Sequence, residues 1–449
     1  GDYAFADCEN IEKINIPDSL ELLGVGVFRN WAKLKEFTIS HDHPKYSIIE
    51  ETTADGKTCQ VLCSKNKDTL ILYMPSNNVT SYTVPSSIRT IDSYAFSGAK
   101  LRTIVIGETV TELGDGLFYN CKQLTSVTLP KNTTEIKYSM FENCTRLKEI
   151  INTENIEKIS GRAFLQCAVL PEVPLSEKVS EIGESAFEGC AAITSITIPS
   201  AITTIPKAVF KDCSKLETVV FPSSLTEIGE SAFEGCAKLY FINLSEGLIR
   251  IDAKAFYQCG RGWIYERDED GNEIKDESGN RIRKEVIIKI PTTVDYIGDQ
   301  AFSGCTGATR IYLPVEVDKD GNVIRAASYV GDQAFGNMPS TKLYTEGRVY
   351  ILDEDGNKTQ DKIYPTGWVK SLDQQVGEVI GRGEFKLDEN GIPVANNSSS
   401  DDNNNNNNDI PKRDTKPGQC DYKENLGYYF MITSVLVSAV ALLRKKQSN

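Results

Sequence analysis

The fold is decided by residues 193–213, ITSITIPSAITTIPKAVFKDC, which recur in the next copy as residues 216–236, LETVVFPSSLTEIGESAFEGC. Both copies place aliphatic residues, a Pro, a Phe and a Cys in nearly the same order. Between Phe118 and Phe256 a Phe recurs every 23 residues without a slip. A repeat of this length is typical of a solenoid, because one short unit buries its apolar residues only by stacking on its neighbours.

The spacing inside one unit predicts its local structure. Ile196 and Ile198 are two residues apart, so they share one face of a strand. Pro199 has no N–H to donate and therefore ends this strand. Ile202 and Ile205 are three residues apart, which predicts a tight irregular or 3₁₀ return. We therefore expect one short parallel strand in each unit.

The repeat phenylalanines are predicted to fill the interior of the stack, one ring to a unit. The expected core rings are Phe118, Phe141, Phe164, Phe187, Phe210, Phe233, Phe256 and Phe302. The same motif also contains Phe5, Phe28, Phe96 and Phe335. An aromatic ring buries a large apolar area, so these rings should dominate the stability of the stack.

Most units also place a Cys three residues after the Phe. The expected ladder of thiols is Cys121, Cys144, Cys167, Cys190, Cys213, Cys236, Cys259 and Cys305. Trp31, Ala99 and Met338 occupy the same place in other units, so the position favours apolar packing. We expect free, buried thiols there instead of disulfides. Outside the repeat, Cys59 and Cys63 leave both a local disulfide and free thiols open.

The repeat resembles a known family of surface proteins. The stretches EIGESAFEGC at 181–190 and again at 227–236 are similar to the BspA-type leucine-rich repeat family. The resemblance covers about residues 1–340. It implies a right-handed, curved leucine-rich-repeat β-solenoid with a parallel sheet, and a role in adhesion to host or neighbouring-cell macromolecules.

Irregular stretches predict where the solenoid is interrupted and where it ends. Hairpin insertions are expected at about 43–75, 260–285 and 316–326, where turn sequences separate strand-like pieces. After residue 340 the period stops, and a β-rich cap is expected at 341–395. Residues 396–425 are mostly rich in Asn, Ser and Asp and predict a disordered stalk. Gly1 falls inside a repeat unit, so we expect the natural chain to begin upstream.

The end of the chain predicts attachment to a membrane. Residues 426–443 are uncharged and mostly apolar, which is just long enough for one transmembrane helix. The basic residues in 444–449 predict a cytoplasmic tail, with the repeats on the cell surface. A buried soluble helix is the alternative. The layout also resembles a cell-wall sorting signal, although the L-P-x-T-G motif of sortase substrates is absent.

Charge and motifs exclude several functions. The net charge is −14, so nucleic acid is not an expected partner. No catalytic or nucleotide-binding motif occurs, and the two histidines, His41 and His43, share one loop. One Cys in each unit gives no tetrahedral metal cluster. The sequence therefore predicts neither an enzyme nor a cofactor.

Binding at the exposed face of the sheet is the main functional hypothesis. Most residues that alternate with the core positions of the strands are Thr, Ser or Glu, which suit exposed strand positions. One aromatic and basic cluster stands out: Phe241, Ile287, Lys289, Arg310 and Tyr312. Such residue types favour interfaces. The sequence leaves two functions open, an adhesin for extracellular proteins or glycans and a surface spacer or coat antigen without a ligand.

Overall fold

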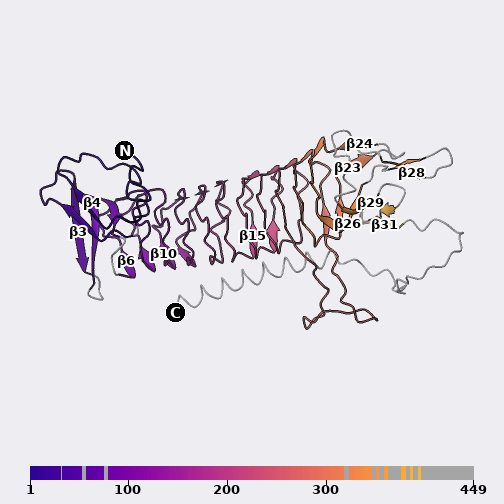
Figure 1. Ribbon diagram of the computed structural model, residues 1–449, viewed down its shortest axis with the longest axis horizontal. Helices are drawn as coiled ribbons and strands as arrows, with labels where there is room; N and C mark the ends of the chain where they lie inside the picture. The colour runs from indigo at the N-terminus through magenta and orange to yellow at the C-terminus, as the bar shows by residue number, and fades with distance from the viewer. Residues whose placement is uncertain are drawn as a thin grey trace. The chain divides into compact units, whose positions relative to one another are not determined.

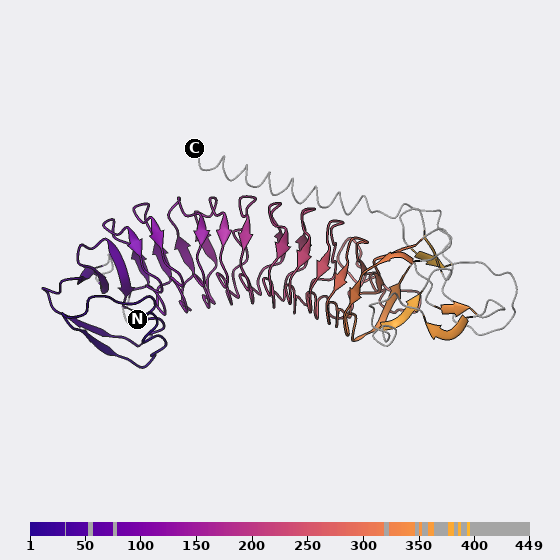
Figure 2. The same cartoon turned by 90° about the horizontal axis from the view of Figure 1, so that it is seen from above.

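The computed structural model describes residues 1–395, apart from residue 32 and residues 53–56, 75–78, 318–322, 346–349, 353–357, 363–375, 381–384 and 388–392. Within this part, successive coils of the chain follow one another along a single axis (Figure 1), and Figure 2 shows the same row of coils from above. Strands of neighbouring coils pair in parallel. The fold is therefore a parallel-sheet β-solenoid, as the repeat predicts.

The I-x-I pattern predicts the strands of the first sheet, a name we use for four separate parallel sheets on successive stretches of the chain. Its strands lie in register one unit apart, for example Ile196 opposite Val219. The strands are β1 (Lys13–Ile16), β2 (Glu36–Ile39), β6 (Ser81–Thr83), β8 (Thr103–Val105), β10 (Ser126–Thr128), β12 (Glu149–Ile151), β15 (Ser195–Thr197), β17 (Thr218–Val220), β20 (Ile287–Lys289), β22 (Arg310–Tyr312), β26 (Met338–Tyr344) and β29 (Val376–Ile380). No strand forms in the unit that contains Pro171 and Pro174, because neither proline can donate to the ladder.

Short parallel strands, divided among three separate sheets that we call together the second sheet, replace the irregular or 3₁₀ return, and that expectation was wrong. After a turn in which the Ile202 N–H donates to the Pro199 carbonyl (3.0 Å), the chain extends and pairs with the next unit. The strands are β5 (Thr69–Tyr73), β7 (Thr90–Ile91), β9 (Glu112–Leu113), β11 (Glu135–Ile136), β13 (Lys158–Ile159), β14 (Glu181–Ile182), β16 (Thr204–Ile205), β18 (Glu227–Ile228), β19 (Arg250–Ile251), β21 (Tyr296–Ile297) and β25 (Tyr329–Val330). Bonding between units satisfies backbone groups that an isolated return would leave exposed.

The repeat rings form one continuous stack in the interior. All eight predicted core rings are fully buried. From Phe96 to Phe335 the centroids of successive rings lie 5.2–5.6 Å apart. Tyr73, 23 residues before Phe96, continues this stack at 5.3 Å. Phe28 packs instead on Trp31 in a separate cluster, and Phe5 remains 54% exposed.

The predicted thiols line the same interior. All eight are buried and free. Each Sγ donates to the carbonyl of the Phe in the preceding unit at 2.9–3.3 Å. Burial raises the pKa of the Cys121 and Cys305 thiols to about 12, so they stay protonated at neutral pH. Cys59 and Cys63 are also buried and free, so the local disulfide does not form.

Two of the three expected hairpin insertions are hairpins, whereas the third, near residues 260–285, is not a single hairpin. Antiparallel strands β3 (Tyr46–Thr52) and β4 (Thr58–Ser64) occupy the first insertion, and β5 links them to the second sheet. Strands β23 (Val315–Val317) and β24 (Val323–Ala326) form another hairpin. The insertion near residues 260–285 holds three antiparallel bridges, described below.

The predicted cap and the segments beyond it are described only in part. Strand β29 extends the first sheet by pairing with β26. One antiparallel pair precedes β29 in the sequence, β27 (Tyr350–Leu352) with β28 (Lys358–Lys362), and another follows it, β30 (Phe385–Leu387) with β31 (Pro393–Ala395). The predicted stalk, transmembrane helix and tail lie outside the described residues. Up to residue 395, the described part of the chain contains no helix that could cross a membrane.

Candidate binding surface

The five predicted binding residues lie together on the outer face of the first sheet. We call them the C-terminal patch: Phe241, Ile287, Lys289, Arg310 and Tyr312. Lys289 lies opposite Tyr312 and Ile287 opposite Arg310 in the register of β20 and β22. A bridge from Asn243 to Lys289 places Phe241 in the next unit of the same column. Three neighbouring units thus present one surface.

The patch owes its outward direction to alternation along each strand. Ile242, Ile288 and Ile311 point inward and are fully buried, so their neighbours must face outward. Phe241 is 40% exposed, and among the described phenylalanines only Phe5 is more exposed. The Lys284 ammonium lies 5.4 Å from the centroid of that ring. The patch therefore offers an aromatic ring with a cation beside it.

The sequence did not predict the next unit, which adds exposed Lys342 to the patch, whereas its Tyr344 is buried beside Tyr312. Lys342 lies opposite Arg310, and Tyr344 lies opposite Tyr312 with its ring centroid 5.1 Å away. The Arg310 guanidinium lies 5.8 Å from the Tyr344 ring. The signal was hidden because the insertion at β23 and β24 lengthens this unit beyond 23 residues. The alternation of Lys342, Leu343 and Tyr344 after Phe335 matches that of Arg310, Ile311 and Tyr312, and it was the available signal for this strand.

The charges of the patch differ in how far they are neutralised. Arg310 Nε lies 2.8 Å from the Glu285 carboxylate, so this cation already has a partner. Lys289 is exposed and forms no ion pair within the described part of the chain. Burial raises the pKa of the Tyr312 hydroxyl, which stays protonated at physiological pH. Lys289 is therefore the cation most available to a partner.

Elsewhere on the first sheet, polar side chains bind one another between units. Lys13 Nζ lies 2.7 Å from Glu36, and the Thr103 hydroxyl donates to Ser81 at 2.9 Å. The Ser126 hydroxyl donates to Glu149 at 3.3 Å. These contacts occupy the donors and acceptors that a ligand would use.

The second sheet also changes character in its C-terminal units. The Arg250 guanidinium lies 3.8 Å from the centroid of the Tyr296 ring, and Tyr296 stacks on Tyr329 at 4.8 Å. The corresponding column of earlier units holds charged or hydroxyl residues, such as Lys158 beside Glu181. Aromatic and basic residues thus gather at one end of both sheets.

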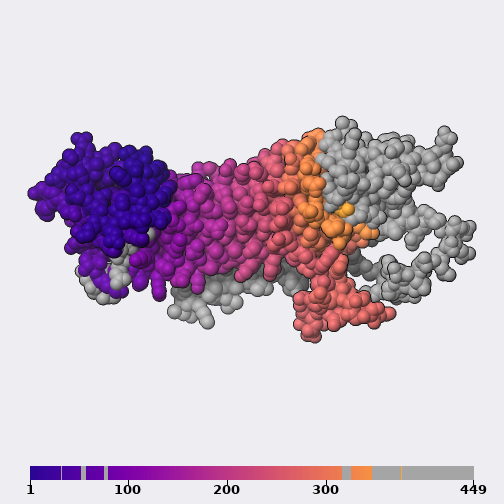
Figure 3. Space-filling view, in the orientation of Figure 1, coloured from indigo at the N-terminus to yellow at the C-terminus, as the bar shows by residue number. Residues whose placement is uncertain are grey.

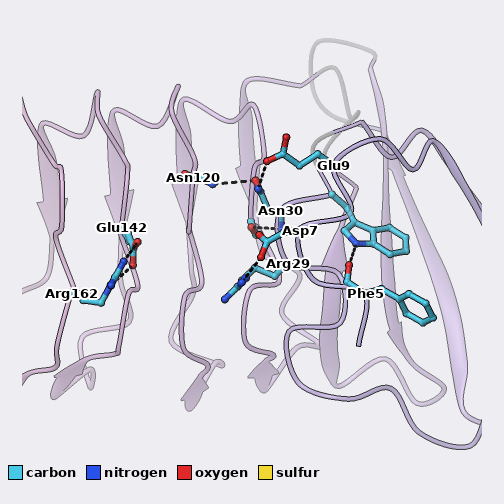
Figure 4. A network of polar contacts seen from close by, with 10 residues as sticks. Phe5, Asp7, Glu9, Arg29, Asn30, Asn120, Glu142 and Arg162 are labelled. Atoms are coloured by element: carbon cyan, nitrogen blue, oxygen red, sulfur yellow. Dashed lines mark hydrogen bonds and ion pairs between the residues drawn. The ribbon is translucent and has the colours of Figure 1, made fainter. Parts of the chain in front are cut away.

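A polar network at the other end of the stack is structural. The Arg29 guanidinium lies 5.4–5.7 Å from the centroids of the Tyr3, Tyr94 and Tyr119 rings and pairs with Asp7. Figure 4 shows this ion pair beside the N-terminal units. The cation is enclosed by the chain's own rings and carboxylate, so it holds units together and offers little to a ligand.

Neighbouring polar groups in the same view are also satisfied internally. Asn30 donates to Glu9 at 2.8 Å and accepts from Asn120 at 3.1 Å (Figure 4). The buried Glu142 accepts two hydrogen bonds from Arg162, at 2.7 and 3.0 Å. A buried carboxylate with a bidentate partner is stable without any catalytic function.

The described residues contain no arrangement suited to a metal ion. Within them, no group of three His, Cys, Asp or Glu side chains could hold one. His43 is buried with Nε2 3.0 Å from the Pro17 carbonyl, whereas His41 is exposed. Asp268 accepts from the backbone N–H of Asn272 at 2.8 Å and so caps its own turn.

Comparison with known proteins identifies the repeat. The family model described as "BspA type Leucine rich repeat region (6 copies)" matches residues 1–53, 72–170, 151–261 and 281–354. No curated protein matches the chain.

Three solved structures illustrate the likeness. A T. pallidum leucine-rich repeat protein is 25% identical, with a TM-score of 0.37 over 42% of this chain and 90% of that one. A leucine-rich cell surface protein from Faecalibacterium prausnitzii is 25% identical, with a TM-score of 0.39 over 67% and 76%. The pneumococcal vaccine antigen PcpA is 21% identical, with a TM-score of 0.29 over 55% and 51%.

Proposed function

The chain belongs to the BspA-type leucine-rich repeat family, and from this premise we propose that it is a cell-surface protein that binds an extracellular protein or glycan through the C-terminal patch. The observation that carries the proposal is the change along the first sheet. Hydroxyl and carboxylate side chains that bind one another give way to aromatic and basic ones in consecutive units. Aromatic and Arg side chains are the residues most enriched at interface hot spots.

The geometry of the patch supports binding by a rigid surface. The strand backbones are fixed by pairing on both sides of β22, so the outward side chains need little ordering when a partner binds. The patch combines the exposed ring of Phe241 with Lys289, which forms no ion pair with any described residue. The proposed function is binding and not catalysis, because the sequence contains no catalytic motif.

Surface placement is part of the same proposal and rests on the sequence. The apolar run at 426–443 followed by the basic residues 444–446 fits a single membrane anchor with the repeats outside. The alternative within this proposal is that the C-terminal segment attaches the protein to the cell wall, although the usual sortase motif is absent.

A spacer without a specific ligand is the second candidate. It is favoured by the earlier units, whose outward side chains pair between units, for example Lys207 with Glu230 at 2.7 Å. A surface that satisfies its own polar groups has little to gain from a partner. The spacer and the adhesin differ in what the C-terminal patch does.

Beads coated with residues 1–395 would distinguish the two functions. We expect coated beads to bind host cells or extracellular matrix more strongly than bare beads, while the soluble monomer binds weakly. Display on one bead raises the effective concentration of each further contact. Equal binding of coated and bare beads to every surface would favour the spacer.

A further inference from the structure

The insertion between Phe256 and Phe302 forms a projection with its own architecture. It begins after Gly262, whose N–H donates to the Thr306 hydroxyl at 3.0 Å, and ends before β20. Figures 1 and 3 show the projection extending away from the coils. Beneath it the stack is continuous, since the rings of Phe256 and Phe302 lie 5.2 Å apart. The projection is therefore an addition that the core does not require.

Three short strands meet in the projection in a closed cycle. The backbone N–H of Glu266 donates to the carbonyl of Ile282, and the N–H of Ile282 donates to the carbonyl of Ile274. The N–H of Ile274 donates to the carbonyl of Glu266 and closes the cycle, and each of the three bonds is 2.9 Å long. The three central residues are spaced eight apart in the sequence. Antiparallel bridges flank the cycle: Tyr265 with Arg283, Arg267 with Glu273, and Lys275 with Arg281.

This cycle places six side chains on one face. Residues directly opposite in antiparallel strands, and those two apart along one strand, share a face. The six bridge residues therefore face one way, and five of them line an open depression of about 490 Å³ together with Gly279 and Asn280. Four of the six are cations and Glu273 is the one carboxylate among them. This balance contrasts with a net charge of −14 for the chain.

Contacts within the face leave much of its positive charge available. The Arg281 guanidinium stacks 4.0 Å from the Tyr265 ring and lies 3.5 Å from Glu273, which also lies 3.8 Å from Arg267. A stacked guanidinium keeps the N–H groups at its edge free to bind oxyanions. Lys275 has no ion pair among the described residues.

A second stacked cation extends the face toward the stem. The Arg283 guanidinium lies 3.6 Å from the centroid of the Trp263 ring. Packing on the ring fixes the orientation of the guanidinium before any ligand arrives. A cation held in this way suits geometric recognition of a planar or tetrahedral oxyanion.

We propose that this face of the projection binds an acidic glycan, with Lys275, Arg281 and Arg283 contacting carboxylate or sulfate groups on its sugars. A depression of about 490 Å³ is larger than a lone inorganic anion needs. The tips of the two arms carry five carboxylates: Asp268, Glu269, Asp270, Asp276 and Glu277. They disfavour a polymer with continuous dense charge, such as DNA. A glycan with spaced charges and neutral sugar rings between them fits both features.

The test measures binding of the full chain to three immobilised polysaccharides and to DNA. The probes are polygalacturonate, which carries carboxylates, heparin, which carries sulfates, and neutral dextran. We expect binding to at least one acidic glycan, none to dextran or DNA, and weakening by salt. Lys275→Glu should reduce the affinity about tenfold or more, because it replaces a contact with a repulsion. Lys215→Glu, an equal change at an exposed lysine in the middle of the stack, should leave it unchanged.

The remaining outcomes are decisive. The proposal would be overturned if the chain bound neither polygalacturonate nor heparin, or if it bound DNA as well as it binds the acidic glycan. It would also be overturned if the Lys275→Glu and Lys215→Glu variants had equal affinity for the glycan. Lys289→Glu tests the C-terminal patch separately. If it alone weakened glycan binding, the first sheet would be the glycan site and the projection would not.

Discussion

Each repeat Phe is a separate contributor to the stability of the stack. Phe210 is fully buried, with the rings of Phe187 and Phe233 5.5 and 5.4 Å away. We expect Phe210→Ala to lower the free energy of unfolding by about 3–5 kcal/mol, because it leaves a cavity between two rings. A denaturant titration of residues 1–395 measures the loss.

The neighbouring thiol provides the control. Cys213→Ala removes a weak hydrogen bond of 3.3 Å to the Phe187 carbonyl, which still accepts from the Cys190 N–H at 3.1 Å. The carbonyl stays satisfied, so the cost should be about 1–2 kcal/mol. Finding the Cys change to be more costly than the Phe change would refute this account of the core.

The thiols also predict a dependence on alkaline pH. Burial raises the pKa of Cys121 to about 12, whereas an unfolded thiol titrates near about 8.5. The buried thiol therefore contributes fully to the stability of the folded protein below pH about 8.5. This contribution is lost as the pH rises toward about 12, because the unfolded thiol loses its proton first.

The matched comparison uses Cys121→Ala, because Ala99 fills the same place in the preceding unit. Above pH about 9, the free energy of unfolding of the wild type should fall more steeply than that of the variant, by about 1.4 kcal/mol per pH unit. Urea titrations at pH 7.5 and 10 measure both slopes. Parallel slopes would mean that Cys121 does not titrate with unfolding.

At this scale the sequence predicts positions better than partners. The 23-residue period places Phe210 and Cys213 in the interior correctly. Tyr73 was missed because the motif around it is lost, although its distance from Phe96 fits the period. The hydrogen bond of each thiol was not predictable, because the acceptor belongs to another unit.

Among the elements, short-range spacing predicts strands and insertions but not long-range bonding. Ile196 and Ile198 identify the first sheet. The second sheet was missed because strands of two residues, such as β16 (Thr204–Ile205), exist only through pairing with neighbouring units. The closed cycle of the projection was likewise hidden, because turn sequences at 268–272 and 276–280 indicate hairpins but not how three strands meet.

Removal of the projection tests its independence from the stack. Replacing residues 264–284 by a short Gly-Ser link should change the free energy of unfolding by less than about 1 kcal/mol. The core hydrogen bonds cross the insertion, since the Phe256 N–H donates to Ala301 at 2.7 Å and Cys305 Sγ to Phe256 at 3.1 Å. Thermal and denaturant unfolding measure the change. Loss of cooperative unfolding would show that the projection is part of the core.

Over the whole described region, neighbouring units carry the stability and one end carries the distinctive surface. Each unit bonds mainly to the next, as in other repeat proteins, so a substitution on one unit should leave distant units intact. This separation allows the C-terminal patch to be changed without loss of the fold. The period could predict that the patch residues share a column, but it could not predict Tyr344, which follows a lengthened unit.

The central claim is that the C-terminal patch binds a partner, and its most direct test compares two lysines. Three sets of beads are coated with residues 1–395 of the wild type, of Lys289→Gln or of Lys215→Gln. Each variant removes one positive charge, but at a different place on the stack. We predict that Lys289→Gln reduces adhesion to host cells or matrix about threefold to tenfold, as for a contact of about 1 kcal/mol repeated across a multivalent surface. Lys215→Gln should adhere like the wild type. Equal adhesion of all three, or an equal loss in both variants, would contradict a specific site on this part of the sheet.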